Sequence, residues 1–263
     1  MNKTSKRPKI LITNDDGIFS MGLKCLWQAL VEYADLFIIA PGSDQSGSGL
    51  GFTLRVPLQI DKVKWEQNTP AWKVNGTPVD CVKLGLSVIL KEKPDLVVSG
   101  INHASNAGRT VLYSGTVGGA IEGVLRNIPS IAFSFEDIDA PDYSQAQKYI
   151  HPIVQHVLEH PLPKGTLLNV NFPYTSTDFK GIKLARQGRS YWIDTPHERI
   201  HPEGTPYFWL GGKWDEQEEH PESDVALLKE GYITVVPIHV DELTDHEHLE
   251  ERKASFEKSF PLL

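Results

Sequence analysis

Short apolar runs alternate with helix-patterned segments along the first half of the chain. The runs at 10–12, 36–39 and 96–98 have the length and the branched, apolar composition of buried strands. Between them, apolar residues recur at helical spacing. The expected elements are strands at 10–13, 35–40, 58–63, 72–74, 94–99 and 128–135, and helices at 22–33, 78–90 and 114–126. Such alternation predicts a mostly parallel sheet with helices on both faces, an α/β fold of the Rossmann-like type. We expect the strands at 58–63 and 72–74 to lie at an edge, and Gly100 to end the strand before it.

The second half is less regular. The pattern predicts helices at 149–158 and 224–230, strands at 167–170, 182–186 and 232–236, and a charged, partly helical tail. Residues 187–224 are rich in aromatic residues, glycine, proline and charge, without a sustained period, which is typical of a protruding hairpin or arm. We therefore expect one α/β domain over residues 1–263. Its core, 1–186, would carry the site, and 187–263 would form an arm and a return to the core.

Composition and charge argue against nucleic-acid and membrane partners. The chain has 26 Lys and Arg against 34 Asp and Glu, a formal net charge of −8, and no dense basic tract, which argues against binding a nucleic-acid polymer. The apolar run that follows the polar start is too short for a signal peptide or a membrane span. We expect a cytoplasmic protein with no membrane partner, in which Cys25 and Cys81 are reduced core residues.

The most informative stretch is Ile10-Leu11-Ile12-Thr13-Asn14-Asp15-Asp16-Gly17, in which an apolar strand runs directly into two adjacent carboxylates. In an α/β protein, ligands collect where strands end. Two neighbouring acids repel one another and resist burial, so a cation is expected between them. The alternative is an acidic turn in which Asn14 or Asp15 caps the next helix.

Polar residues also follow two further strands. Asp44-Gln45-Ser46-Gly47 comes after the second strand, and Ser99-Gly100-Ile101-Asn102 ends a third. Because the carboxyl ends of parallel strands meet at one edge, these side chains can surround one ion. An all-oxygen set suits Mg²⁺, Mn²⁺ or Ca²⁺ rather than zinc. Ser114-Gly115-Thr116 opens a helix, and such an N-terminus binds anions. A metal site beside an anion site is the arrangement expected for phosphate-ester chemistry.

These motifs resemble the SurE family of survival proteins, which are metal-dependent nucleoside monophosphate phosphatases. The resemblance spans nearly the whole chain. It rests on residues 12–17, Ser46-Gly47, 99–102 with 106–108, and 113–123. It rests also on 206–212, which resembles the family's arm, and on 224–234, which resembles its C-terminal return to the core. The resemblance implies hydrolysis of nucleoside 5′-monophosphates with Mg²⁺ or Mn²⁺, with 3′-nucleotides as an open alternative. It also implies homodimers or homotetramers that exchange C-terminal elements.

The family's residues carry over onto positions of this chain. The metal ligands fall on Asp15, Asp16, Ser46 and Asn102. The catalytic set is then Asp15, Asp16, Asn102 and Asn106, and the substrate-binding set is Asn14, Ser114, Gly115 and Thr116. The chain departs from the usual family pattern at three places: Ser20-Met21 in place of the Ala-Pro of many relatives, Gln45 in place of a common arginine, and Ala104 in place of a frequent glycine. Loss of the arginine removes a positive charge that would favour a phosphate.

Two alternatives stay open. The chain can be a nucleotide- or phosphate-binding module that does not cleave its ligand, although the paired acids are costly there without a metal. Within phosphatase chemistry, one carboxylate can act as a nucleophile, but adjacent Asp15-Asp16 does not match the Asp-x-Asp spacing that this route calls for. Gly47-Ser48-Gly49 lacks the dinucleotide spacing, which disfavours NAD. The helical histidines, His151, His156 and His160, are expected to be solvated rather than ligands.

Overall fold

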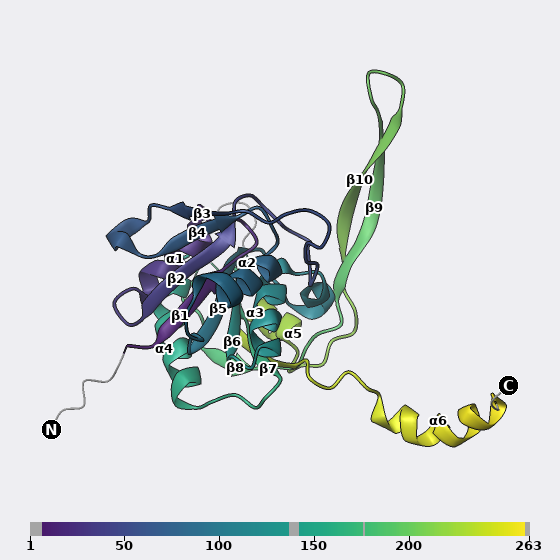
Figure 1. The fold of residues 1–263 in the computed structure, drawn as a ribbon. Helices are drawn as coiled ribbons and strands as arrows, with labels where there is room; N and C mark the ends of the chain where they lie inside the picture. Colours follow the sequence, from purple (N-terminus) through teal and green to yellow (C-terminus); the bar gives the residue numbers. More distant parts are fainter. Residues whose placement is uncertain (1–6, 137–141, 176, 261–263) are drawn as a thin grey trace.

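The structure, a computed structural model, describes residues 7–136, 142–175 and 177–260 (Figure 1). Its strands are β1 Lys9–Thr13, β2 Asp35–Pro41, β3 Ile60–Val63, β4 Ala71–Val74, β5 Leu96–His103, β6 Ser130–Phe135, β7 Thr166–Phe172, β8 Ile182–Leu184, β9 Tyr191–Ile200, β10 Pro206–Asp215 and β11 Ile233–His239. Its α-helices are α1 Met21–Leu30, α2 Pro78–Leu84, α3 Gly115–Leu125, α4 Ser144–Glu159, α5 Asp224–Lys229 and α6 His246–Ser259.

A nine-stranded sheet in the order β3-β4-β2-β1-β5-β6-β7-β11-β8 forms the body of the molecule. Strand β1 lies next to the central strand, β5, and pairs in parallel with β2 and β5. Two pairs are antiparallel, β3 with β4 and β7 with β11, so the sheet is mostly parallel as predicted. The expected edge pair is confirmed as β3 and β4. Parallel pairing brings the carboxyl ends of β1, β2 and β5 to one edge, where ligands bind in this architecture.

The pleat of the strands divides the core into two layers. Ile10 and Ile12 of β1 pack with side chains of α1 and α4 on one face. Leu11, between them, points to the other face and packs with Cys81 of α2. Side chains alternate in this way because successive residues of a strand face opposite sides. Helix α3 covers β6 and β7 on the α2 face, which confirms helices on both faces of the sheet (Figure 1).

Two elements differ from the sequence prediction. Strand β5 does not end at Gly100 but continues to His103, with an irregularity in its pairing to β6 between Ser99 and Asn102. Gly100 has a φ of +128°, and a Cβ there would lie 2.3 Å from the carbonyl oxygen of Phe133, so this glycine bends the strand past its neighbour. The helix expected over 78–90 ends at Leu84 and continues as one wider turn over Gly85–Ile89.

Residues 187–224 contain a β-hairpin, as predicted. Strands β9 and β10 form a separate two-stranded sheet that projects far from the body, and α6 stands apart at the end of an extended segment (Figure 1). Helix α6 has no buried residue. On the arm, Phe208, Trp209 and Leu210 are 61%, 67% and 76% exposed. Among the described residues, no helix has the length and apolar character needed to cross a membrane.

Candidate active site

Asp15 lies directly after β1 and faces the beginning of α3. Its carboxylate is 3% exposed and accepts hydrogen bonds from the hydroxyl and the backbone amide of Thr116. The sheet and the helix therefore meet at this side chain, and the helix N-terminus partly offsets the cost of burying its charge. Burial is nevertheless the largest influence and raises the pKa of Asp15 above its ordinary value.

The same threonine joins Asp15 to the end of β5. Thr116 Oγ1 lies 3.3 Å from Asn102 Oδ1 and also contacts Asp15 Oδ1. A hydroxyl carries one hydrogen, so it can satisfy only one of these two acceptor oxygens at a time. The amide nitrogen of Asn102 donates to the carbonyl oxygen of Ala104 at 2.7 Å, which fixes its oxygen toward Thr116. Asp15 Oδ1 and Asn102 Oδ1 thus converge on one hydroxyl hydrogen, and one of the two oxygens is left without it.

Asp16 completes the acidic pair. Its Oδ2 accepts a hydrogen bond from the backbone amide of His103 at 3.3 Å, which ties the β1 turn to the end of β5. Burial, followed by repulsion from the Asp15 carboxylate, raises the pKa of Asp16 to about 6. A cation that binds both carboxylates would remove this repulsion.

Asn14 braces the turn between β1 and α1. Its amide nitrogen donates to Gly17 O at 3.0 Å and to Ser20 Oγ at 2.7 Å, and Ser20 in turn caps α1. Within the described part of the chain, the buried Oδ1 of Asn14 has no hydrogen-bond partner. Asn14 therefore shapes the turn with its nitrogen and retains an unsatisfied oxygen beside the carboxylates.

The two serines that follow β2 occupy different positions. Ser46, a ligand in the sequence prediction, is exposed, and its hydroxyl donates to Asp44 at 2.6 Å. Ser48 was not predicted; its hydroxyl is buried without a hydrogen-bond partner among the described residues. A Cβ placed on Gly115 would lie 2.6 Å from Ser48 Oγ and 2.9 Å from Asp15 Cβ, so Ser48 adjoins the carboxylate. The repeated serine of Ser46-Gly47-Ser48 was the only sequence signal for it.

Asn106, predicted to be catalytic, is buried and hydrogen-bonded to β6 and β7. Its side-chain nitrogen donates to Ser134 Oγ at 2.7 Å, and its backbone amide donates to Asn171 Oδ1 at 2.7 Å. Asn169 donates to the carbonyl oxygen of Asn106 at 2.9 Å. These bonds fix the loop after β5 to β6 and β7. In this structure Asn106 braces that loop, and its amide nitrogen is already engaged.

Asp224, at the start of α5, joins the same loop to the base of the arm. Its carboxylate accepts hydrogen bonds from the amides of Gly108 at 3.1 Å and Gly188 at 2.8 Å, and from Gln187 Nε2 at 2.9 Å. The side chain is fully buried, and burial raises its pKa to about 6. Sequence analysis missed this residue because its partners are 36 to 116 positions away.

The histidines are not brought together around an ion. His156 and His160 stack on one another at the end of α4, and His151 packs on Tyr33. His103 meets Asp16 through its backbone amide, and its side chain is exposed. Over the described ranges, no three His, Cys, Asp or Glu side chains form a group that could hold a metal.

The donor set fits a hard divalent cation. Two carboxylates, the oxygens of Asn14 and Asn102, and nearby hydroxyls supply oxygen only. The Asn14 oxygen and the Ser48 hydroxyl are buried without partners among the described residues, as expected of groups that await a ligand. Mg²⁺ is usually held by one or two carboxylates and keeps several waters. Asp15 and Asp16 with Asn102 would hold such an ion, and the paired acids are consistent with it.

The fold and the site together define an α/β protein with a cluster of acidic and other oxygen-bearing side chains at the carboxyl edge of its sheet, beside the N-terminus of a buried helix. Residues 10–194 match the family model described as "Survival protein SurE", and the chain belongs to the SurE family. It is 48% identical over 256 residues to the 5′-nucleotidase SurE of Protochlamydia amoebophila (strain UWE25), covering 96% of this chain and 98% of that one. It is 42% identical over 257 residues to the 5′-nucleotidase SurE of Syntrophomonas wolfei subsp. wolfei, covering 97% of each.

A solved structure agrees with the fold. The crystal structure of the SurE protein from Aquifex aeolicus superposes with a TM-score of 0.81 at 37% sequence identity and covers 95% of this chain and 100% of that one. The similarity therefore extends over the sheet, the arm and the C-terminal return. It confirms the family resemblance and the α/β fold predicted from the sequence.

Proposed function

We propose that this chain is a nucleotidase that hydrolyses nucleoside 5′-monophosphates to nucleosides and inorganic phosphate with a bound divalent cation, Mg²⁺ or Mn²⁺. Membership of the SurE family, with close relatives that bear the name 5′-nucleotidase, supports the reaction. The observation that carries the proposal is the convergence of Asp15, Asp16 and Asn102 on Thr116 and His103 at one edge of the sheet.

The residues divide the work by position. Asp15, Asp16, Asn102 and Ser46 would hold the cation. The Ser46 hydroxyl donates its hydrogen to Asp44, which leaves the lone pairs of its oxygen available to a cation. A bound divalent cation neutralises phosphate charge and lowers the pKa of a coordinated water. Ser114 and Gly115 lie at the N-terminus of α3, next to the residues around Asp15. The positive end of the helix dipole would favour an anionic substrate there. Ser48 adds a hydroxyl beside Asp15 that is free to bond to the ligand.

Direct attack by water fits the site better than an aspartyl-phosphate. A carboxylate nucleophile needs an accessible oxygen, but Asp15 is 3% exposed and held by the hydroxyl of Thr116. Asp16 accepts a hydrogen bond from the amide of His103 and is repelled by the charge of Asp15. In this proposal the two carboxylates would hold a cation and orient a water that attacks phosphorus from the side opposite the leaving oxygen.

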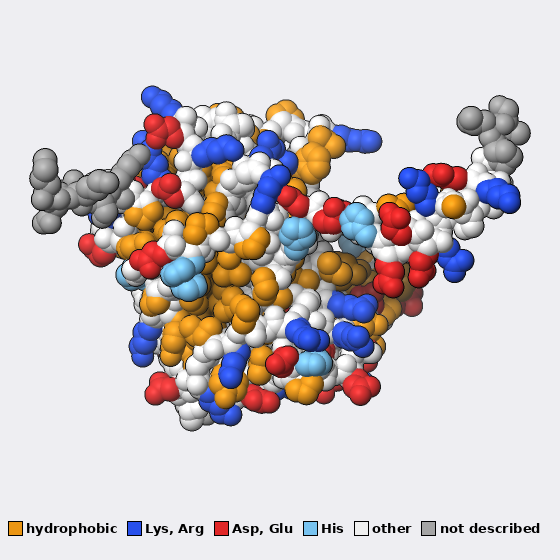
Figure 2. All heavy atoms as spheres, turned by 90° about the horizontal axis from the view of Figure 1, so that it is seen from below, with side chains coloured by type: hydrophobic (Ala, Val, Ile, Leu, Met, Phe, Trp, Pro, Cys, Tyr) orange, Lys and Arg blue, Asp and Glu red, His pale blue; other side chains and the backbone are white. Residues whose placement is uncertain are grey.

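We further propose that the chain is a homodimer or homotetramer built through its C-terminal elements. Helix α6 buries none of its residues, and its Phe256 and Phe260 are 67% and 69% exposed. Figure 2 shows α6 extending away from the body, whose face in this view carries apolar side chains. Monomers rarely expose large apolar side chains in such numbers on free elements. Size exclusion at micromolar concentration is expected to give a dimer or larger species, and a monomer would overturn this part.

The experiment for the reaction is phosphate release from 5′- and 3′-nucleoside monophosphates with Mg²⁺, with Mn²⁺ and with a chelator. Release that requires a divalent cation and favours the 5′-series is expected. The competing proposal, a module that binds nucleotide without cleaving it, predicts tight nucleotide binding with no release under any metal.

A further inference from the structure

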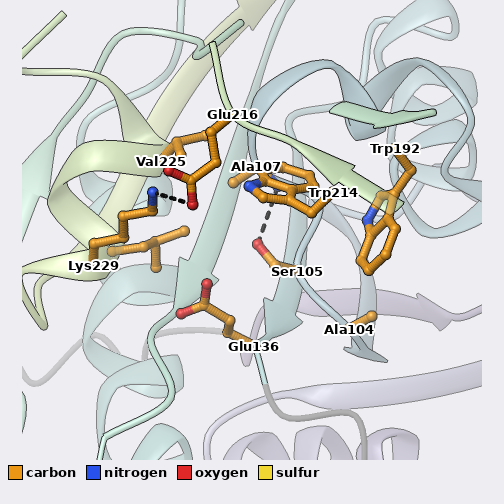
Figure 3. A pocket seen from close by; sticks show the side chains of 10 residues that line it. Ala104, Ser105, Ala107, Glu136, Trp192, Trp214, Glu216, Val225 and Lys229 are labelled. Carbon is orange, nitrogen blue, oxygen red and sulfur yellow. Dashed lines mark hydrogen bonds and ion pairs between the residues drawn. The ribbon is translucent and has the colours of Figure 1, made fainter. Parts of the chain in front are cut away.

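A cavity of about 310 Å³ lies between the loop after β5, the base of the arm and α5 (Figure 3). Its volume is at the lower end of the range for small-molecule pockets, roughly 300–1,000 Å³. The walls combine two tryptophans of the arm, Trp192 and Trp214, with Ser105, Glu136, Glu216 and Lys229. None of these residues belongs to the metal or phosphate site described above.

One short stretch of chain joins the cavity to the residues around Asp15 and Asp16. Ala104 lines the cavity, and its carbonyl oxygen accepts the amide of Asn102, the residue that faces Thr116 and Asp15. Consecutive Cα atoms are 3.8 Å apart, so two residues span at most about 7.6 Å. A small molecule whose phosphate lies at Asn102 can therefore place its other end in the cavity.

One wall of the cavity is aromatic. The rings of Trp192 and Trp214 meet edge to face, with centroids 5.7 Å apart and planes at 67°. Because the two rings are not parallel, a flat ligand can stack on one indole and meet the edge of the other. Trp192 is 50% exposed, so a face of its ring is available to a ligand. Stacking on an aromatic ring is the common way for proteins to bind a base without reading its identity.

The opposite side of the cavity carries acceptors. Glu216 forms an ion pair with Lys229, at 2.9 Å between Oε1 and Nζ, so the lysine offsets its negative charge. Glu136 lies across from the indoles (Figure 3), and its Oε2 accepts a hydrogen bond from the Tyr174 amide at 3.2 Å. A carboxylate offers about four lone pairs, so Glu136 can also accept a hydrogen bond from a ligand in the cavity.

We propose that this cavity binds the base of the substrate, which stacks on Trp192 and Trp214 and donates an exocyclic amino hydrogen to Glu136. The proposal rests on the proposed nucleotidase function and adds a base preference to it. Cytosine, adenine and guanine have such an amino group. Uracil and hypoxanthine have a carbonyl oxygen where cytosine and adenine have the amino group, and that oxygen repels a carboxylate. The cavity therefore favours amino-bearing bases over their oxo counterparts.

The sharpest test compares substrates that differ only in this group. We would measure kcat/KM for CMP against UMP and for AMP against IMP in the wild-type protein. The same ratios would be measured in Glu136→Gln and in the control Glu159→Gln, an exposed residue at the end of α4. The wild type and the control are expected to favour the amino-bearing member roughly tenfold or more, as one hydrogen bond to a charged acceptor provides. In Glu136→Gln, whose amide donates as well as accepts, both ratios are expected to fall toward one.

A second arm tests the aromatic wall without catalysis. Cytidine, which has no phosphate, is expected to change the tryptophan fluorescence of the wild type and to bind more tightly than uridine. Trp192→Ala is expected to weaken cytidine binding roughly five- to a hundredfold, whereas Trp209→Ala, on the exposed tip side of the arm, is expected to leave it unchanged.

Two failures are distinguishable. If the protein hydrolyses p-nitrophenyl phosphate and all four nucleotides with equal kcat/KM, or if Glu136→Gln keeps the wild-type ratios, the base-binding inference is overturned and the nucleotidase stands. If no phosphate ester is hydrolysed, the proposed function fails, and preferential binding of cytidine over uridine still decides whether the cavity reads the base.

Discussion

Adding one methyl group at Gly115 is expected to separate activity from stability. Gly115 opens α3, and its Cβ in an alanine variant would lie 2.9 Å from Asp15 Cβ, 3.0 Å from Asp15 Oδ2 and 2.6 Å from Ser48 Oγ. The first distance is roughly 0.6 Å short of a favourable carbon–carbon contact of about 3.5 Å. Ser48 can rotate its hydroxyl away, but Asp15 Cβ is next to the backbone, so the carboxylate and the helix must move apart.

This shift acts on the site and hardly on the fold. Misplacing a reacting or binding group by about 1 Å can cost on the order of a hundredfold in rate, so we expect kcat/KM for a 5′-nucleotide to fall about ten- to a hundredfold in Gly115→Ala. Alanine is a better helix former than glycine by up to about 1 kcal/mol, which offsets the strain. The melting temperature is therefore expected to stay within about 4 °C of the wild type.

The assay is steady-state phosphate release with thermal melting measured on the same preparations. Gly42→Ala serves as the matched control, because a Cβ at Gly42 meets no atom closer than 3.6 Å. Wild-type activity in Gly115→Ala would refute the placement of Asp15 against the helix N-terminus. Equal losses of activity in both variants would show that the effect is not specific to this contact.

Three further outcomes follow from single side chains. Asp224→Asn replaces one carboxylate oxygen with an NH₂ group. That group would face either the Gly108 amide and Gln187 Nε2, or the Gly188 amide, all of which are donors. The free energy of unfolding is therefore expected to fall by about 1–3 kcal/mol, and an unchanged melting temperature would contradict the link between loop and arm. The pKa of Asp224 is raised from 3.8 to about 6, so the folded state holds this proton more tightly. Protonated Asp224 therefore adds up to about 3 kcal/mol to the free energy of unfolding below about pH 4, and this contribution is lost as the pH rises through about 6. Chemical denaturation of the wild type between pH 4 and 7 should show this fall in stability, and Asp224→Asn should not. Ser48→Ala is expected to raise KM for 5′-nucleotides several-fold with an unchanged or higher melting temperature, since it removes an unpaired buried hydroxyl, and an unchanged KM would remove Ser48 from the site.

Most of the fold was predictable because its signals are local. Apolar runs of strand length, separated by helical spacing, set the order of β1, α1, β2, β5, α3 and β6. The bend at Gly100 was not predictable, because a glycine after a strand also signals its end. The pairing of Asn102 and His103 with Ser134 and Phe135, distant in the sequence, is what carries the strand on to His103.

The site divides in the same way. Asp15, Asp16, Asn102 and Thr116 were predicted to lie together because each was expected to follow a strand or to open a helix, and parallel strands bring such positions to one edge. Ser48, Asp224 and Glu136 were not predicted, because unpaired atoms, distant amides and a cavity wall have no sequence periodicity. Asn106 was found by resemblance, but its bracing contacts with Ser134 and Asn171 became visible only in the structure.

The most direct test of the central claim is phosphate release from AMP by the wild type and by Asp16→Asn, with Mg²⁺ or Mn²⁺ and with a chelator. Asp61→Asn, an exposed carboxylate paired with Lys73 at the edge of the sheet, is the matched control. We expect phosphate release to stop with the chelator, to fall at least about a hundredfold in Asp16→Asn and to persist in Asp61→Asn. Changes even to residues that only support metal ligands lower metal affinity or activity roughly ten- to a hundredfold. Full activity of Asp16→Asn, or release that is indifferent to the chelator, would contradict a cation held by the paired acids.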